Sequence, residues 1–171
     1  WSGSTCTLDQ NYTLSAGDTL HIPSGITLAI NDIFNNYGTI ENNYSGTIIN
    51  YDTINNHNAA ILNTDGTINN EGAINNHNGA IIHNFNSGTI ITDVTFNNDG
   101  RTINNYSGLI RNDGTFNNDG TFNNDGTFNN DGTIDNTGTI TGNDIINNQP
   151  AAETAAETAA ETAAETAAET A

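Results

Sequence analysis

The sequence predicts an all-β fold, a three-sided parallel β-solenoid whose coils each contain about 18–22 residues. The first observation is a six-residue unit, Gly-Thr-apolar-Asn-Asn-Asp, which is repeated through residues 113–134. The second is that every third apolar position forms a series with spacings of 20, 20, 22, 20, 18 and 18 residues. The third is the motif Ile-Asn-Asn-His-Asn, which starts at Ile54 and returns at Ile74. Self-similarity at such a period is typical of solenoids.

One apolar residue in six fits neither an amphipathic helix nor a simple alternating strand. Thr, Ile and Phe favour strands, whereas Asn, Asp and Gly favour turns, so each unit is read as a short strand and a corner. Three strands then complete one coil, and the apolar residues form three columns. Column one is expected to contain Leu28, Ile48, Ile68, Ile90, Ile110, Phe128 and Ile146. Column two is expected to contain Phe34, Ile54, Ile74, Phe96, Phe116 and Ile134. Column three is expected to contain Ile40, Ile61, Ile81, Ile103, Phe122 and Ile140.

This narrow core explains why 34% hydrophobic residues are enough, against a usual ~45–50%. We place the Asn pairs that follow each apolar residue at the corners, because Asn tolerates the left-handed conformation. Stacked Asn amides are also expected to bond along the axis, as in cross-β ladders. An Asn-rich sequence can instead be a disordered tract, but three ordered apolar columns disfavour that alternative.

Three segments follow from this reading. Residues 1–27 differ from the repeats and form an N-terminal cap or entry coil, because the stretch from Tyr12 to Leu28 alternates apolar and polar residues around two glycine turns. Residues 28–148 are the solenoid repeats. Open solenoid ends expose unpaired strand edges, which need a cap or a partner.

Residues 149–171 form a tail or linker, in which Ala-Ala-Glu-Thr occurs five times after Gln149-Pro150. Ala and Glu favour a helix, but glutamates four residues apart repel one another, so a helix is marginal here. The tail is therefore expected to be helical or extended, and a flexible spacer is the alternative.

The stretch TLSAGDTLHIPSGITL, followed by GTINN-like repeats, resembles secreted surface proteins and adhesins of bacteria and archaea with Asn/Gly/Thr-rich β-solenoid repeats. The resemblance covers roughly residues 11–148. It implies a β-solenoid at the cell surface, in a stalk, an adhesin or an envelope component, and it implies no particular activity.

Charge and motifs exclude several function classes. The formal charge of −18 disfavours nucleic acid and anionic lipid as partners. The sequence has no transmembrane run, P-loop, dinucleotide fingerprint or nucleophile motif. A pectin-degrading type of β-helix enzyme is disfavoured, because no basic cluster or convergent acid pair marks a groove. We therefore expect no enzymatic activity.

Four acidic residues share one register position and form a candidate Ca²⁺ site. They are Glu71, Asp93, Asp113 and Asp131. Neighbouring carboxylates roughly 5 Å apart repel, and Ca²⁺ with its oxygen ligands would relieve this. The alternative is a solvated acidic face with ordinary counterions. The Ca²⁺-binding nonapeptide of toxin repeats is absent from the sequence.

Export is expected because the chain has no Met and starts at Trp1, which suggests a removed signal peptide. Candidate N-glycosylation sites are Asn11, Asn43 and Asn105, each followed by Tyr and then Thr or Ser. Cys6 is the single cysteine, so it is either free or paired between chains.

Two further patterns carry weaker hypotheses. His57 and His77 share a register position and are either a metal pair or an ordinary surface pair. Threonines before the apolar residues are expected in hydroxyl rows that bind ice or carbohydrate, or in ordinary solvent-facing strand positions. Those threonines are Thr115, Thr121, Thr127 and Thr133.

The sequence favours a non-enzymatic extracellular structural protein that stacks end to end with copies of itself into a surface filament. The alternative is an adhesin, a stalk or a glycan-binding module, with Tyr44 and Tyr106 contributing to the contact surface.

Overall fold

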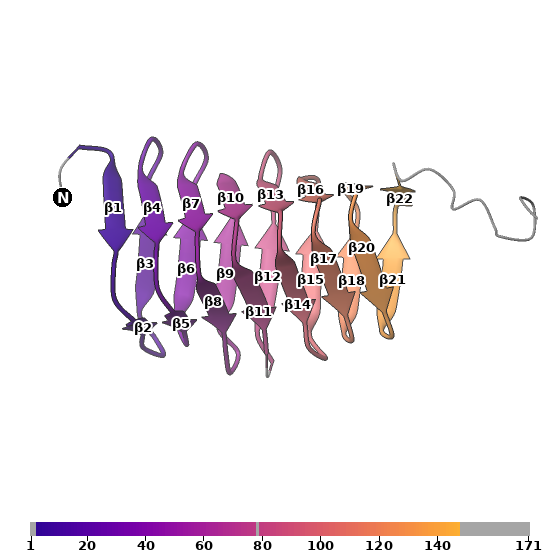
Figure 1. Cartoon of the computed structure of the whole chain (residues 1–171), viewed down its shortest axis with the longest axis horizontal. Helices are drawn as coiled ribbons and strands as arrows, with labels where there is room; N and C mark the ends of the chain where they lie inside the picture. Colours follow the sequence, from indigo (N-terminus) through magenta and orange to yellow (C-terminus); the bar gives the residue numbers. More distant parts are fainter. Residues whose placement is uncertain (1–2, 78, 148–171) are drawn as a thin grey trace, which may run out of the picture.

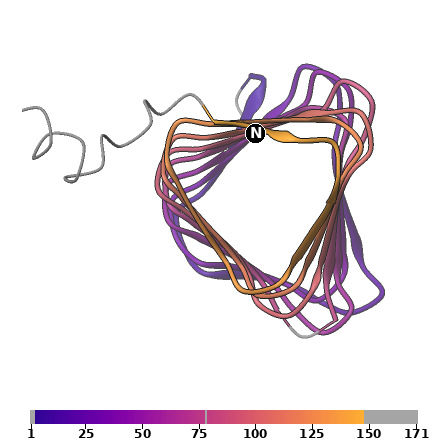
Figure 2. The ribbon, with the colours of Figure 1, turned by 90° about the vertical axis from the view of Figure 1, so that its right-hand side faces the viewer.

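A computed structural model of the chain describes residues 3–77 and 79–147, and it confirms the three-sided parallel β-solenoid. Consecutive strands lie on successive faces of a prism, and each strand pairs in parallel with the strand three places further along the chain (Figure 1). Figure 2 shows the triangular cross-section seen along the rod.

Each face of the rod is one parallel sheet. The first contains β1 (Thr5–Leu8), β4 (Thr27–Ile30), β7 (Thr47–Asn50), β10 (Thr67–Asn70), β13 (Thr89–Thr92), β16 (Leu109–Asn112), β19 (Thr127–Asn130) and β22 (Ile145–Asn147). The second contains β2 (Tyr12–Leu14), β5 (Phe34–Asn36), β8 (Thr53–Asn56), β11 (Ala73–Asn76), β14 (Thr95–Asn98), β17 (Thr115–Asn118) and β20 (Thr133–Asn136). The third contains β3 (Thr19–Ile22), β6 (Thr39–Asn42), β9 (Ile61–Thr64), β12 (Ile81–Asn84), β15 (Thr102–Asn105), β18 (Thr121–Asn124) and β21 (Thr139–Gly142).

The described strands make seven complete coils, and β22 begins an eighth. Strands β1 to β3 form the first coil and pair with β4, β5 and β6, so the three sheets begin before Leu28. At a spacing of about 4.8 Å per coil, seven coils give a rod of about 34 Å. The predicted tail, residues 149–171, lies outside the described residues.

Column two of the predicted core is confirmed, since Phe34, Ile54, Ile74, Phe96, Phe116 and Ile134 align strand by strand. Columns one and three are wrong at three positions, where two apolar residues are adjacent in sequence. Leu62, Ile82 and Ile145 face the core in place of Ile61, Ile81 and Ile146.

The cause of these errors is the alternation of side chains along a strand, in which a shift by one residue exchanges the two faces. The core residue is the one two positions before the inward Asn or Thr, as in Leu62-Asn63-Thr64. The same rule selects Ile82, two positions before Asn84, and Ile145, two positions before Asn147.

The placement of the Asn pairs at corners is also wrong. The second Asn of each pair, for example Asn56 or Asn118, is the last residue of a strand and is fully buried inside the prism. Positive φ values at described residues other than glycine occur instead at Ser45, Asn58, Ala59 and Asn86. The predicted bonding of Asn amides along the axis is confirmed, for instance from Asn56 to Asn76 at 3.0 Å.

Glycine at the corner before the first sheet allows one coil to lie directly on the next. A Cβ on Gly66 would lie 2.3 Å from the carbonyl oxygen of Gly46 and 2.6 Å from that of Asn43. Both contacts are with backbone of the preceding coil, so a side chain at this position would force the coils apart.

The later coils approach threefold symmetry. Each side of the coil from β17 to β19 has the strand sequence Thr-Phe-Asn-Asn, and two residues separate these strands. The rings of Phe116, Phe122 and Phe128 meet across the prism with centroids 5.1–5.4 Å apart, which fills the core with one side chain from each face.

Candidate functional site

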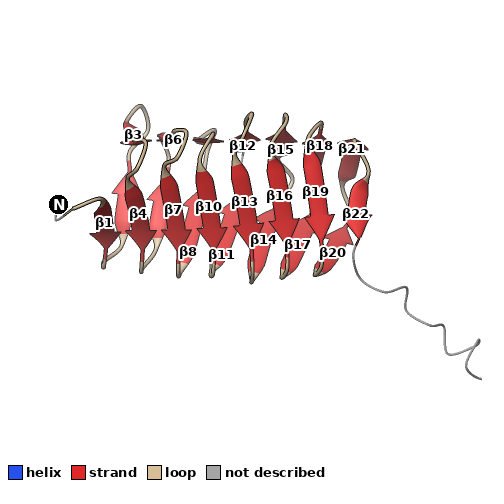
Figure 3. Ribbon diagram, turned by 90° about the horizontal axis from the view of Figure 1, so that it is seen from above, coloured by secondary structure: helices blue, strands red, loops and turns tan. Residues whose placement is uncertain are grey.

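Both ends of the rod carry strand edges without a partner in the described structure. Strands β1, β2 and β3 lie at one end of the three sheets, and β22, β20 and β21 lie at the other (Figure 3). Each of the six pairs with a neighbour on one side only. Figure 2 shows no described segment crossing the triangular cross-section. Such edges are templates for pairing with another strand.

The hydrogen bonds of the neighbouring residues show in which direction the unpaired backbone groups point. The carbonyls of Ser4 and Leu8 accept from the N–H groups of Thr27 and Asn31 at 2.7 and 2.9 Å. Alternate residues of a strand bond to opposite neighbours, so the N–H and C=O groups of Thr5 and Thr7 point out of the end. At the other end, the N–H of Thr133 donates to the carbonyl of Gly114 in the preceding coil at 2.8 Å. The N–H and C=O groups of Ile134 therefore point out of the C-terminal end.

The two ends also expose the cross-section of the apolar core. Cys6, Leu8 and Leu20 are only partly buried at the N-terminal end, and Tyr12 there is 42% exposed. Ile134, Ile140 and Ile145 are only partly buried at the C-terminal end. Covering these side chains with a second surface would gain hydrophobic free energy.

Inside the prism, the second sheet carries an uninterrupted row of amides. Each Nδ2 donates to the Oδ1 of the next coil, at 2.7–3.0 Å, from Asn36 to Asn56, Asn76, Asn98, Asn118 and Asn136. These amides donate to backbone as well, as Asn118 does to the carbonyl of Thr139 at 3.2 Å. The row ends at the exposed Asn136, whose Nδ2 donates to the carbonyl of Gly138 in its own coil at 3.3 Å. The amides therefore tie successive coils together from within.

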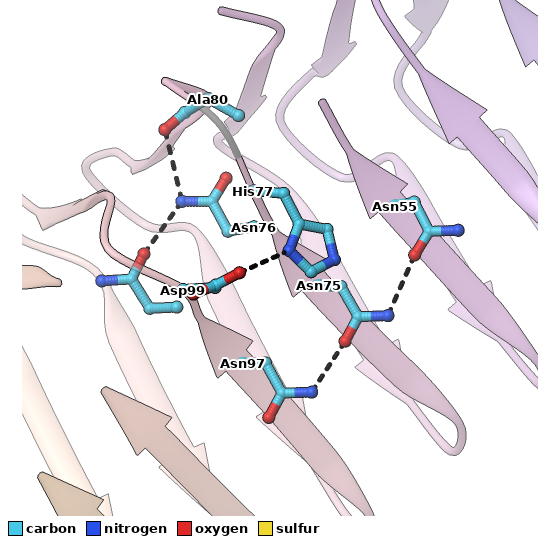
Figure 4. A network of polar contacts seen from close by, with 8 residues as sticks. Asn55, Asn75, Asn76, His77, Ala80, Asn97 and Asp99 are labelled. Atoms are coloured by element: carbon cyan, nitrogen blue, oxygen red, sulfur yellow. Dashed lines mark hydrogen bonds and ion pairs between the residues drawn. The ribbon is translucent and has the colours of Figure 1, made fainter. Parts of the chain in front are cut away.

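A second row of amides on the outside of the same sheet runs in the opposite direction (Figure 4). Asn97 donates to Asn75 at 2.7 Å, and Asn75 donates to Asn55 at 2.9 Å, each towards the preceding coil. The same sheet is thus held by amide rows of opposite polarity on its two faces.

The predicted pair of histidines belongs to a longer stack along one corner. The rings of Tyr37 and His57 lie 5.0 Å apart and those of His57 and His77 lie 5.4 Å apart, nearly parallel. His77 Nδ1 lies 3.1 Å from Asp99 Oδ2 (Figure 4). Tyr37 and Asp99 were missed in the sequence, although they lie 20 residues before His57 and 22 residues after His77, which is one coil in each case.

Burial and the neighbouring His77 lower the pKa of His57, and burial lowers the pKa of His83. A folded-state pKa below the usual value of 6.5 means that the unfolded chain binds the proton more readily. Stability is therefore expected to fall as the pH drops below about 6.5. Between pH 7.5 and 5.5, the urea midpoint of the double variant His57→Asn/His83→Asn should fall by less than that of the wild type. An equal loss in both proteins would contradict this assignment.

An open polar groove of about 380 Å³ lies beside this stack. Its lining residues come from the outer face of the second sheet, from the adjoining corner and, with Asn98, from the inner amide row. They are His77, Asn97, Asn98, Asp99, Asn117, Asp119 and Asp135. Within residues 3–77 and 79–147, no group of three or more His, Cys, Asp or Glu side chains is arranged to hold a metal ion. The groove offers hydrogen-bond donors and acceptors to a polar ligand.

The candidate Ca²⁺ residues do follow the same corner of four successive coils, after β10, β13, β16 and β19. Glu71, Asp93 and Asp131 are exposed, and Asp113 is half-buried. Asp113 forms an ion pair with Arg111, whose Nε donates to it at 2.9 Å. This hydrogen bond and the charge of Asp113 raise the pKa of Arg111. Asp131 and Asp93 of the row also act electrostatically on Arg111, so this cation offsets part of the negative charge of the row.

The glycosylation candidates differ in accessibility. Asn11 and Asn43 are exposed at corners, where a glycan can be accommodated. Asn105, in contrast, is fully buried in the folded rod. Its Nδ2 donates to Asn124 Oδ1 at 2.8 Å and to the carbonyl of Thr127 at 3.2 Å, so the atom that would carry the sugar is bonded among the inward-facing amides of the third sheet.

The threonines named in the sequence belong to three separate rows, one on each sheet. Thr115 and Thr133 align with Thr95 on the second sheet, but Thr121 lies on the third sheet and Thr127 on the first. The described hydroxyls are therefore divided among three faces.

The remaining candidates lie near the ends and corners. Cys6 is a free, partly buried cysteine in β1, at the N-terminal end of the rod. Tyr44 is 64% exposed, whereas Tyr106 stacks on Phe85 at 5.2 Å.

The described part of the chain contains no helix long and apolar enough to cross a membrane. Comparison with protein families, with curated proteins and with solved structures found no match for this chain.

Proposed function

We propose that this protein is a non-enzymatic extracellular structural subunit, and that copies stack end to end through their solenoid ends into a surface filament. The observation that carries the proposal is that all three sheets end in an unpaired parallel strand at both ends of the described rod. One end of a copy offers backbone groups that the other end of the next copy can pair.

Head-to-tail contact between two different surfaces produces an open filament when rotation does not close a ring. A straight rod with its two contact surfaces at opposite ends favours the open form. The apolar side chains at both ends would be covered in such a contact. The formal charge of −18 would keep neighbouring filaments apart in solution. The resemblance to secreted surface proteins supports the extracellular location.

Electron microscopy of the purified full chain, with sedimentation as a function of concentration, tests the filament directly. The variant Thr7→Pro removes an outward-pointing N–H from β1 without removing a donor to β4, and proline blocks strand edges. Thr7→Ala is the matched control, because it keeps that N–H. Filaments in the wild type and in Thr7→Ala, but not in Thr7→Pro, are expected. A protein that stays monomeric at high concentration would contradict the proposal.

The second candidate function is glycan binding by an adhesin or stalk. The observation that favours it is the groove beside His77, which is lined with amides and carboxylates that can bond to sugar hydroxyls. Exposed Tyr44 adds an aromatic surface on another corner. Binding of the monomer to a glycan on an array would support this candidate, provided that the variants Asn97→Ala and Asn117→Ala lose this binding. Binding to no glycan would remove it.

A further inference from the structure

We infer that consecutive copies in the filament are rotated about the rod axis by one face, a third of a turn, so that β1 of one copy continues the sheet that ends in β20. The inference rests on the proposed end-to-end assembly and specifies the surface through which a second copy docks. It follows from the number and position of the terminal strands.

The described solenoid contains one strand more than seven complete coils. The first sheet therefore reaches an eighth level through β22, whereas the second and third sheets end one level lower with β20 and β21. The end of the rod is a step, with its high side on the first sheet. At the other end, β1, β2 and β3 form one complete level.

Stacking without rotation would place β1 on β22, because both belong to the first sheet. The next copy would then be held one level too high over the other two sheets. Strands β2 and β3 would lie about 10 Å from β20 and β21 instead of the roughly 4.8 Å that hydrogen bonding requires. Two of the three sheets would stay unpaired.

Rotation by one face removes this gap, because the next position along the spiral after β22 lies directly above β20. Strand β1 then pairs with β20, β2 with β21, and β3 with β22. Continuing the register of the existing pairs sets Thr7 opposite Asp135, Leu14 opposite Gly142 and Leu20 opposite Ile145. All three sheets then run on without interruption.

The side chains fit this register. Leu14 points into the prism, and its partner Gly142 stands where the coils below carry the amides of Asn105 and Asn124. Because Gly142 has no side chain, it leaves room for the leucine. Leu20 and Ile145 are both partly buried residues of the core cluster, and they would cover each other. The outward groups of Ile134 and Thr7 also point towards each other.

The rotation also requires that one face of the rod can substitute for another. The later coils meet this condition, because their three sides have strands of equal length separated by two residues. The same strand spacing on each side allows the next copy to be placed in any of three orientations, and the step made by β22, together with Gly142, selects one of them.

Paired cysteines distinguish the two arrangements. In a Cys6→Ala background of the full chain, the variant Thr7→Cys/Asp135→Cys places two outward-facing thiols on adjacent strands only in the rotated filament. The matched variant Thr7→Cys/Ile146→Cys does so only in the unrotated one. Adjacent strands bring Cα atoms within the 4.4–6.8 Å that a disulfide needs. We expect oxidised ladders of multimers on a non-reducing gel from the first variant and not from the second.

The outcomes separate the two proposals. Filaments with ladders from the Ile146 variant, or with ladders from neither variant, overturn the rotation and leave the end-to-end assembly standing. Absence of filaments and of ladders in every variant overturns both. Image analysis of wild-type filaments measures the rise and the rotation per subunit independently. We expect a rise of about 35 Å along the axis and a rotation of a third of a turn.

Discussion

Replacing Asn98 by Asp is expected to lower the free energy of unfolding by about 4 kcal/mol, because it places an unpaired charge inside the rod. Asn98 is 1% exposed. Its Nδ2 donates to Asn118 Oδ1 at 2.7 Å, to the carbonyl of Arg101 at 2.8 Å and to that of Thr121 at 3.2 Å. A carboxylate would turn an oxygen towards these three oxygens and could bond to none of them.

The neighbouring substitution Asn97→Asp is the matched control, because it makes the same change on the outer face of the same strand. Asn97 is half-buried and donates to Asn75 at 2.7 Å, so we expect a loss of about 1 kcal/mol there. Urea titrations followed by circular dichroism measure both variants. The deficit of Asn98→Asp should shrink as the pH is lowered and the buried carboxyl is protonated. Equal deficits at the two positions would show that the inner row does not depend on its amides.

Gly66→Ala is expected to cost about 3 kcal/mol through forced separation of two coils. The added methyl group would meet two backbone oxygens of the preceding coil at 2.3 and 2.6 Å, and backbone cannot rotate away as a side chain can. Gly25→Ala is the control at the same corner of the first coil, where φ is +74° and nothing lies within 4 Å of the added atom. Only the conformational cost of about 1 kcal/mol applies there. Equal thermal destabilisation of both variants would contradict the close-approach argument.

The coil period was predictable from the sequence because one apolar residue per strand marks each coil. The fully buried Ile54 and Ile74 are an example, since their spacing of 20 residues is the register that the structure shows. The choice between Ile61 and Leu62 was not predictable from hydrophobicity, since both are strongly apolar. It depends on the inward Thr64, whose role becomes clear only once buried polar residues are recognised as part of the core.

The site was harder to predict, because composition does not distinguish a buried amide from an exposed one. Asn105 satisfies a glycosylation pattern, yet it is fully buried and faces the inside of the third sheet. The step at the C-terminal end depends on the number of strands between Thr5 and Asn147, and this number is known only once every strand has been assigned. The stack from Tyr37 to Asp99 joins residues of different types, so a search for repeated letters does not find it.

The alignment of the hydrogen bonds with the long axis has a mechanical consequence. A pulling force between the two ends loads the coil-to-coil bonds in series, so the weakest coil opens first while the others stay intact. The last coil, where β20 and β21 are mostly exposed, is the expected starting point. Each opened coil of 18 residues would release roughly 60 Å of chain at up to ~3.5 Å per residue. Such a rod lengthens in steps under tension and absorbs mechanical work at each one.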